Sequence, residues 1–410
     1  MGTKSTGKKG KGTANGLSTR AGTGKNDGRA RSAAAQSKND SGKRRIRYAV
    51  VGLGHIAQVA VLPAFAHARE NSELAALISD DPEKLEKLGR KYGVEHRSDY
   101  DDFERALAVS GADAVYIALP NHLHREYTER AAAVGVHVLT EKPMAVTEED
   151  CEAMIDACDR NGVKLMVAYR LHFEEANLKA VEVVQSGRIG EPRFFNSVFT
   201  MSVQEGDIRL NPRELGGGTL YDIGIYCINA ARYLFEDEPV EVLAASATGG
   251  DPRFSAPGVD EMTAATLRFP GDRLATFVTS FGTADISRLE VAGTEGTLVL
   301  DPAYEYAGAL RHELTIGGRT RTRTFPRRDQ FAPELVYFSD CIMSGEDPEP
   351  SGLEGLGDIR IIRALYASAD SGGPVALGPF DKHERPTLKQ EIRKPAVGKP
   401  ALVNVEAPSE

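Results

Sequence analysis

The chain is poor in cysteine and in long apolar runs, and each shortage excludes a class of protein. Its 410 residues include four cysteines, at positions 151, 158, 227 and 341. They form no CxxC pair and no metal-ligand spacing with histidine, which argues against a disulfide scaffold and against a zinc site. We therefore expect reduced, packed cysteines and no metal. No apolar run approaches the length that crosses a bilayer, so no membrane association is predicted.

Positive charge is concentrated at one end of a chain that is acidic elsewhere. Residues 1–45 hold 12 Lys and Arg against 2 Asp, and the other residues hold 38 against 57 Asp and Glu. The basic segment has almost nothing large and apolar to bury, which predicts a disordered tail over residues 1–44. It lacks the apolar middle of a secretory signal, which favours a cytoplasmic protein. Because an acidic body repels polyanions, we expect no nucleic-acid partner, and we interpret the tail as a solvating segment or an arm around a neighbouring subunit.

Strand and helix patterns alternate from residue 46 to residue 168. Continuous apolar runs predict buried strands within 46–52, 73–79, 113–120, 136–143 and 163–169. Helical patterns lie between them, with Asp81 and Thr147 as expected N-caps and Gly93 and Gly162 at the expected ends. This alternation predicts an α/β protein whose residues 45–168 form a doubly wound parallel sheet.

The pattern changes after about residue 170. Long alternating runs, joined by turn signals, predict an α+β domain over residues 169–380 with a large open, mainly antiparallel sheet. A final helix, within residues 353–372, is expected to pack back on the core. Residues 381–410 are rich in proline and charge, so we expect an extended C-terminal tail that is poorly packed on its own.

A glycine pair follows the first strand. Gly52-x-Gly54-x-x-Ala57 matches the dinucleotide fingerprint of a Rossmann domain: the first glycine permits the turn, the second permits close approach of a pyrophosphate, and the small Ala57 lets helix and strand pack. His55 and Ile56 open the helix, whose free N–H groups suit the anion. These residues are predicted to bind a nicotinamide dinucleotide.

The end of the second strand bears on the choice of nucleotide. An NAD site prefers an acid there, whereas this chain has Ser79, with Lys84 five residues later. A hydroxyl and a lysine suit a 2′-phosphate and favour NADP, while Asp80 argues against one. NADP is therefore the predicted cofactor and NAD the alternative.

Several motifs together resemble the Gfo/Idh/MocA oxidoreductases. The sequences VGLGHIA, ALPNHLH, LTEKPMA, VAYR and GGGTLYDIGIY occur in the order and spacing of that family, from about residue 46 to about residue 380. The chain looks closest to the glucose–fructose oxidoreductase branch, because Tyr226 stands where many relatives have histidine and because of the Ser79 and Lys84 pair. Two features depart from that branch: an export signal is missing, and Asp80 replaces a small neutral residue.

The resemblance implies hydride transfer between a sugar or polyol carbon and the nicotinamide. It implies that the substrate lies between the Rossmann domain and the second sheet, that the Lys142–Pro143 peptide is cis, and that Glu141 contacts the nicotinamide ribose. It also implies a homo-oligomer that associates through the C-terminal sheet.

A hydride that leaves a C–OH carbon requires a base for the hydroxyl proton. Free tyrosine has a pKa of about 10, and a nearby ammonium stabilises the tyrosinate. We therefore predict Tyr226 as the acid/base and Lys142 as its electrostatic partner and substrate ligand. Asp222 lies four residues before Tyr226, on the same helix face, and is predicted to anchor the sugar.

Further candidates lie on loops at strand ends. Pro120, Asn121 and His124 follow the third long strand and are predicted to face the cofactor. Tyr169 and Arg170 end another strand and are expected to reach the cofactor or the sugar, although a structural ion pair is an equal alternative for Arg170. Arg209 is predicted at the substrate mouth, and Gly216–Gly218 as a flexible approach to Asp222.

The leading hypothesis is an NADP-dependent oxidoreductase that oxidises an aldose to a lactone. Reduction of a second sugar is coupled to this step if the cofactor stays bound. The alternatives are an NAD-dependent polyol or inositol-type dehydrogenase and, from another class, a non-catalytic dinucleotide-binding sensor or scaffold. NAD-assisted glycoside cleavage is the least favoured.

Overall fold

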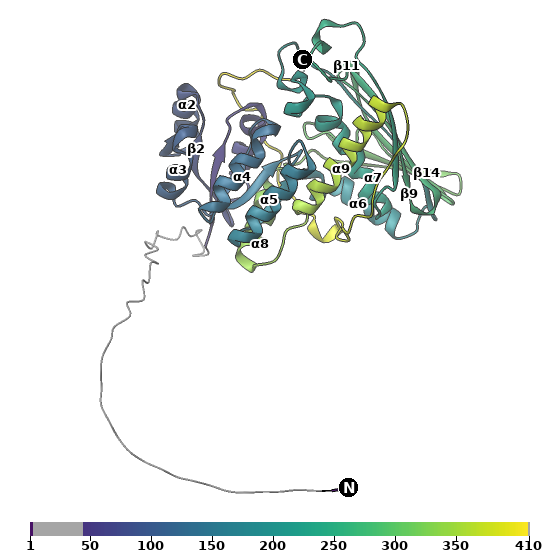
Figure 1. Ribbon diagram of the computed structural model, residues 1–410, viewed down its shortest axis with the longest axis horizontal. Coiled ribbons are helices and arrows are strands. Elements are labelled where there is room, and N and C mark those ends of the chain that lie inside the picture. The colour runs from purple at the N-terminus through teal and green to yellow at the C-terminus, as the bar shows by residue number, and fades with distance from the viewer. Residues whose placement is uncertain (3–43, 409–410) are drawn as a thin grey trace. The chain divides into compact units, whose positions relative to one another are not determined.

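The computed structural model describes residues 1–2 and 44–408 (Figure 1). The basic tail predicted over residues 1–44 therefore lies almost wholly outside the described residues. Within the described part of the chain, no helix is long and apolar enough to cross a membrane. All four cysteines are described, and each is buried and free of a disulfide, as expected.

The first sheet has six parallel strands in the order β3-β2-β1-β4-β5-β6. Its strands are β1 Ile46–Val51, β2 Ser72–Ile78, β3 His96–Ser98, β4 Ala114–Ile117, β5 His137–Glu141 and β6 Leu165–Ala168. The apolar runs are continuous because helices cover both faces. The strand order reverses between β1 and β4, and ligands of such sheets bind at the carboxyl ends beside this reversal.

The helices of this half begin and end at the predicted signals. The side chain of Asp81 accepts hydrogen bonds from the N–H groups of Glu83 and Lys84 at the start of α2 (Pro82–Tyr92), which Gly93 ends with a φ of 69°. Thr147 caps α5 (Glu148–Asn161) in the same way. The other helices are α3 Phe103–Ser110, α4 His124–Ala133 and α8 Ala332–Ser344. After β1 the chain forms a π-helix, η1 (Ala57–Val61), where an ordinary helix was expected.

The second sheet has nine strands in the order β14-β13-β12-β11-β7-β10-β9-β8-β15. They are β7 Pro192–Ser202, β8 Glu241–Ala247, β9 Met262–Phe269, β10 Arg273–Ser280, β11 Gly282–Gly293, β12 Gly296–Leu300, β13 Leu310–Ile316, β14 Arg319–Phe325 and β15 Val375–Ala376. The sheet is mainly antiparallel, as predicted. However, β7 and β10 are parallel, which makes it mixed.

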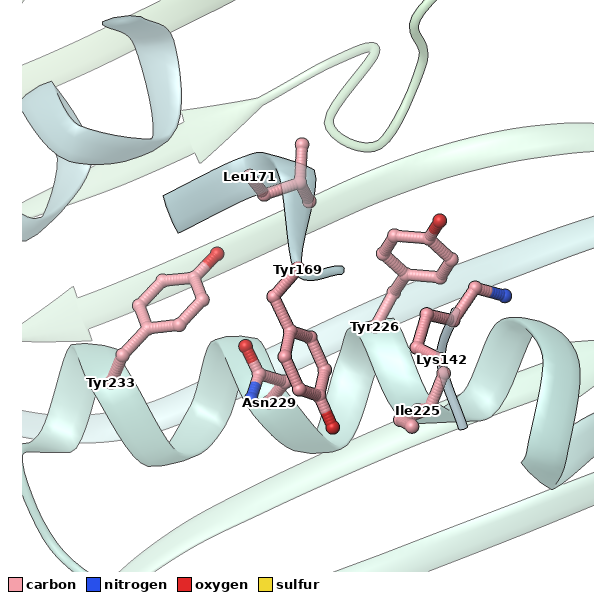
Figure 2. A pocket seen from close by; sticks show the side chains of 7 residues that line it. All are labelled: Lys142, Tyr169, Leu171, Ile225, Tyr226, Asn229 and Tyr233. Carbon is pink, nitrogen blue, oxygen red and sulfur yellow. The ribbon is translucent and has the colours of Figure 1, made fainter. Parts of the chain in front are cut away.

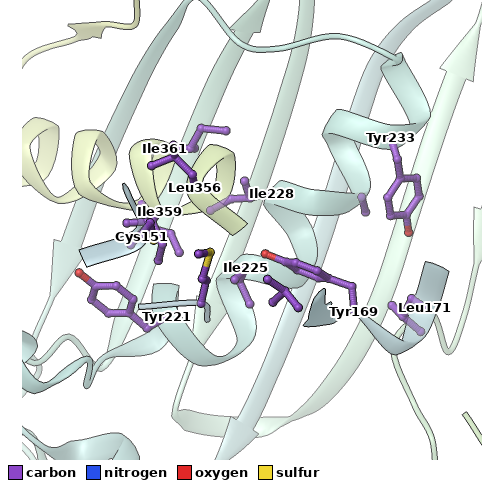
Figure 3. Packing of buried hydrophobic residues seen from close by; sticks show 14 of the residues in the cluster. Cys151, Tyr169, Leu171, Tyr221, Ile225, Ile228, Tyr233, Leu356, Ile359 and Ile361 are labelled. Carbon is purple, nitrogen blue, oxygen red and sulfur yellow. The ribbon is translucent and has the colours of Figure 1, made fainter. Parts of the chain in front are cut away.

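Helices α6 (Glu175–Gln185), α7 (Ile225–Phe235) and α9 (Gly352–Ser371) cover one face of the large sheet (Figure 1). One continuous apolar cluster joins this layer to the first sheet. Figure 3 shows Ile225 and Ile228 of α7 beside Leu356 and Ile359 of α9 within that cluster. Helix α7 is therefore held by packing between the two sheets, and the predicted return of the last helix to the core is confirmed.

Residues 381–408 are largely extended and pack against other parts of the chain. The side chain of Lys382 is 1% exposed and pairs with Glu354 at 3.3 Å, and Arg385 pairs with Glu238 at 2.7 Å. Buried acids far away in the sequence hold this segment, and its own composition gives no sign of them.

Candidate active site

A cleft of about 650 Å³ lies between the carboxyl ends of the parallel strands and the large sheet. Both halves of the chain contribute to it. The predicted site residues that line it are Gly52, Gly54, His55, Ile56, Ser79, Lys84, Pro120, Asn121, Glu141, Lys142, Arg170, Arg209, Asp222 and Tyr226. Residues separated by as many as 170 positions thus meet in one space.

The fingerprint loop forms one wall of the cleft. Gly52 has a φ of 87°, and a Cβ there would lie 2.5 Å from the carbonyl oxygen of Ala118, so only glycine fits. A Cβ on Gly54 would meet nothing within 4 Å, so this backbone is open to a ligand. Ala57 is fully buried behind the loop. This cradle fits a pyrophosphate group, since backbone can approach it closely and the helix start supplies N–H groups.

The C-terminal end of β2 and the start of α2 line one end of the cleft, where the sequence predicts the adenosine of the nucleotide. Ser79 is buried, and its Oγ accepts a hydrogen bond from the N–H of Asp81 at 3.2 Å. Lys84 Nζ lies 3.8 Å from Asp81 Oδ2. Ser79, Asp80 and Lys84 all line the cleft. Ser79 and Lys84, which favour NADP, and Asp80, which argues against it, therefore lie at the same end of the cleft.

Three charged groups meet at the other end of the cleft. Lys142 Nζ donates to the backbone oxygen of Asp222 at 2.8 Å and to its Oδ1 at 3.1 Å. Arg209 Nε donates to Asp222 Oδ2 at 2.5 Å. The Lys142–Pro143 peptide is cis, as the resemblance implied. Asp222, which was predicted to anchor the sugar, lines the cleft, and each of its carboxylate oxygens is bonded to one of these cations.

Burial and charge oppose each other in this cluster. Burial would raise the pKa of Asp222, but Arg209 and Lys142 hold that pKa well below its usual value. Burial would lower the pKa of Lys142, but the charges of Asp222 and Tyr226 outweigh it and raise that pKa. Lysine and aspartate are therefore both ionised at neutral pH.

The ring of Tyr226 lies between two cations. Lys142 Nζ is 4.8 Å and Arg170 Cζ is 4.9 Å from its centroid. The rings of Phe199 and Tyr304 pack against it at 5.6 and 5.8 Å. Figure 2 shows the Tyr226 and Lys142 side chains next to each other. Two cationic groups therefore lie close to the ring of the predicted acid/base.

Arg170 is buried, and its hydrogen bonds go to neutral groups. It donates to the side chain of Gln330 and, at 2.6 Å, to the backbone oxygen of Tyr304. It also lies 5.3 Å from the centroid of the Tyr306 ring. These bonds join Arg170 to neutral groups, so they give no support to the alternative that Arg170 forms a structural ion pair.

Glu141 and the loop after β4 complete the cleft wall. Glu141 Oε1 accepts a hydrogen bond from the hydroxyl of Tyr116 at 2.8 Å, and burial raises the pKa of this carboxyl. Asn121 Nδ2 donates to the backbone oxygen of Gly216 at 2.9 Å. This bond links the first half of the chain to the segment that precedes Asp222.

Besides Ala57, which is buried behind the fingerprint loop, two predicted site residues lie outside the large cleft. His124 is fully buried, and its ring nitrogens bond to the backbone oxygens of Pro143 and Leu119 at 2.9 and 2.8 Å. The Tyr169 hydroxyl donates to Asp358 Oδ2 at 2.6 Å. Tyr169 borders a cavity of about 10 Å³ behind Lys142 and Tyr226, and Figure 2 shows its hydroxyl pointing away from that of Tyr226. Both residues support the site rather than face it.

The three glycines before Asp222 were predicted to be flexible, but they are tightly packed. A Cβ on Gly217 would lie 1.7 Å from the backbone oxygen of Asn211. Gly218 has a φ of 103°, and a Cβ there would lie 2.5 Å from Asp260 Oδ1. Glycine is needed here because there is no room for a side chain, so this segment fixes the position of Asp222.

Sequence reasoning missed several residues of the cleft. They are Tyr100, Phe199, Met201, Tyr304 and Tyr306, together with Ala407 and Pro408 near the end of the chain. No local pattern marks them, because each reaches the cleft through tertiary packing.

Both halves of the chain match the same family. Residues 46–169 match the description "Oxidoreductase family, NAD-binding Rossmann fold", and residues 177–299 match the "GFO/IDH/MocA C-terminal domain".

Three known proteins are similar over most of the chain. D-xylose 1-dehydrogenase [NADP(+)] of Haloarcula marismortui is 34% identical over 81% of this chain and 93% of its own. The crystal structure of aldose-aldose oxidoreductase from Caulobacter crescentus, complexed with glycerol, is 41% identical with a TM-score of 0.77, over 82% of this chain and 100% of that one. A 3-ketoreductase from Actinomadura kijaniata, in complex with NADP and TDP-benzene, is 26% identical with a TM-score of 0.70, over 79% of this chain and 98% of that one.

Proposed function

This chain belongs to the Gfo/Idh/MocA oxidoreductase family, and on that basis we propose that it is an NADP-linked enzyme that oxidises the hemiacetal carbon of an aldose to a lactone. Family membership makes it an NAD(P)-dependent oxidoreductase, as the sequence predicted. The choice of NADP and of an aldose is supported by the names of its relatives, which include an NADP-linked xylose dehydrogenase and an aldose-aldose oxidoreductase.

One observation carries the proposal. Lys142 and Tyr226, from different halves of the chain, meet in the cleft that the fingerprint glycines line. A bound nicotinamide dinucleotide supplies the hydride acceptor. The chain's own groups then have to receive the proton and hold the reacting oxygen.

Tyr226 is the proposed acid/base. In the oxidation, its phenolate accepts the proton of the sugar hydroxyl as the C–H bond gives up its hydride. Lys142 and Arg170 lie beside its ring, at 4.8 and 4.9 Å from the centroid. In the reverse direction, the neutral hydroxyl returns the proton to the carbonyl oxygen.

Lys142 is the proposed ligand of the reacting oxygen. An ammonium group has three donors, and Asp222 takes two of them through its backbone oxygen and Oδ1. The third is available to a substrate in the cleft. Asp222 holds Lys142 and Arg209 through two ion pairs, and its contact with the sugar remains part of the proposal because it lines the cleft.

A second candidate has support of its own. Asp80 lines the adenosine end of the cleft, where a carboxylate suits the ribose hydroxyls of NAD. This residue favours an NAD-linked polyol or inositol-type dehydrogenase.

Kinetics with both nucleotides test the proposal. We expect kcat/KM to be at least about tenfold higher with NADP than with NAD across a panel of aldoses and polyols, with a lactone as product. Lys84→Ala should lower this value for NADP and leave it unchanged for NAD. A preference for NAD and polyols would favour the second candidate, and tight nucleotide binding without turnover would favour a sensor.

Association through the large sheet is also part of the proposal. The outer face of this sheet carries half-exposed apolar side chains on neighbouring strands, namely Phe194, Leu243, Met262 and Leu274. Such a face suits a second copy of the chain. Light scattering of the purified protein tests this, and a monomer at micromolar concentration would contradict it.

A further inference from the structure

The end of the described chain runs across the rim of the cleft. Residues 401–408, here called the strap, make contacts with both sides of it. In Figure 1 the yellow C-terminal segment passes beside the first sheet and ends near β11 of the large sheet. Three sets of hydrogen bonds define this path.

The first set joins the strap to the fingerprint loop. Val403 donates its N–H to Gln58 Oε1 at 2.8 Å, and Gln58 Nε2 donates back to the Val403 oxygen at 2.9 Å. The same Nε2 donates to the backbone oxygen of Leu53, between the two fingerprint glycines, at 2.9 Å. Gln58 is 1% exposed. One buried amide therefore couples the strap directly to the loop that faces a pyrophosphate.

The second set joins the strap to the adenosine end. Asn404 Nδ2 donates to Asp81 Oδ2 at 3.1 Å and to Glu83 Oε2 at 2.8 Å. Asp81 and Glu83 begin α2, directly after Ser79 and Asp80. Asn404 has a φ of 49°, a left-handed conformation that its side-chain bonds help to hold.

The third set joins the strap to the opposite wall. The backbone oxygen of Pro408 accepts a hydrogen bond from the N–H of Gln204 at 3.0 Å, just beyond β7. Ala407 and Pro408 themselves line the cleft. Between Val403 and Pro408 the chain thus crosses from the first half of the molecule to the second.

The segment before the strap is held more firmly than the strap itself. Lys382 and Arg385 are anchored by buried ion pairs, and Arg327 donates to the backbone oxygen of Val397 at 2.9 Å. The strap has no comparable buried charge: its bonds are few, and Asn404 is exposed. It can therefore lift from a fixed base at a cost of a few hydrogen bonds, without disturbing the core.

We propose that the strap is part of the nucleotide site and slows release of the bound dinucleotide. This rests on the proposed function, which puts the nucleotide in the cleft. Because the strap is bonded both to the fingerprint loop and to the start of α2, a nucleotide that leaves the cleft on this side has to displace it.

The rate of nucleotide release tests the strap. NADPH fluorescence is followed after mixing the loaded full-length protein with excess NADP. We expect release to be at least about tenfold faster in a chain that ends at Pro400. It should be several-fold faster in Asn404→Ala, which removes two hydrogen bonds, and in Val403→Pro, which removes one. Glu406→Gln alters an exposed strap carboxylate outside these contacts and should release at the wild-type rate. Thermal unfolding identifies any variant that is misfolded, and the single substitutions then decide.

The outcomes separate the strap from the proposed function. If the wild type oxidises aldoses but the strap variants release the nucleotide at the wild-type rate, the role of the strap is overturned and the proposed function is not. Release that depends on the strap, in a protein that turns over no sugar, would uphold the strap and overturn the proposed reaction. A protein that binds neither NADPH nor NADH would overturn both.

Discussion

Two clusters of buried charge lie close together in this molecule, and only one of them borders the cleft. Arg232 is fully buried and bonds to Glu238, Glu354 and Asp358 at 2.7 to 2.8 Å. Lys142, Asp222 and Arg209 form a cluster of similar geometry. In both, charge pairing opposes the effect of burial on pKa: it raises that of Arg232 and lowers that of Asp222.

The two clusters differ in whether the cation keeps a hydrogen-bond donor that has no partner among the described residues. Each guanidinium nitrogen of Arg232 donates to a carboxylate or backbone oxygen of the protein. Lys142 makes two hydrogen bonds to Asp222, and its third N–H donor is left for a ligand in the cleft that it lines. Both clusters contain a shifted pKa, so such a shift does not identify a functional site by itself. The Lys142 cluster is distinguished by an ammonium donor that is free to bind a ligand in the cleft.

The largest effect should come from the Arg232 cluster, in which every guanidinium nitrogen is bonded within the protein. Arg232→Met leaves the buried Asp358 without its cation and removes one of the cations of Glu238 and Glu354, and we expect a loss of about 3–5 kcal/mol in the free energy of unfolding. Denaturant titration measures this. As a control, Arg268→Met breaks an exposed pair with Glu241 and should cost less than about 1 kcal/mol. Equal losses in the two variants would remove the distinction between the clusters.

The second effect concerns chemistry and not stability. Tyr226→Phe keeps the ring between Lys142 and Arg170 but removes the group that exchanges the proton. We expect kcat to fall by about a hundredfold or more with little change in unfolding. Tyr92→Phe makes the same change on α2, away from the cleft, and should leave kcat as it was. A near-normal kcat for Tyr226→Phe would exclude this residue as the acid/base.

The smallest effect is a displacement of the pH profile. Asp222 helps to raise the pKa of Lys142, whereas burial lowers it. In Asp222→Asn the effect of burial prevails, so the pKa of Lys142 falls and the ammonium is lost at lower pH. We therefore expect the alkaline limb of kcat/KM to move to lower pH, with an activity loss of about tenfold at neutral pH. An alkaline limb at the wild-type pH would mean that Lys142 does not depend on Asp222.

Much of the fold could be predicted because its signals are local. Continuous apolar runs marked the five longer parallel strands, and Asp81, Gly93, Thr147 and Gly162 marked helix ends where the structure has them. The parallel pairing of β7 with β10 was not predicted, because register between distant strands depends on the whole sheet.

The site was predicted less completely than the fold. Tyr169 and Arg170 are adjacent, yet only Arg170 lines the large cleft. Both lie beyond the end of β6 at Ala168, where Arg170 opens a 3-10 helix over Arg170–His172, so the alternation of a strand does not predict where either side chain points. His124 is bonded to backbone oxygens of two loops, at Leu119 after β4 and at Pro143 after β5, which no motif indicates. The strap is bonded to residues more than 300 positions away in the sequence, and nothing in its own Pro-rich sequence predicts which residues these are.

The position of β7 bears on how the protein folds. Its partners, β10 and β11, are synthesised long after it, and Tyr226 lies in the intervening chain. Pairing across such a separation is slow, whereas the first sheet joins strands that are neighbours in sequence or nearly so. During refolding, affinity for a nucleotide should therefore return before turnover does, and a half-renatured sample would be a nucleotide-binding protein without catalysis.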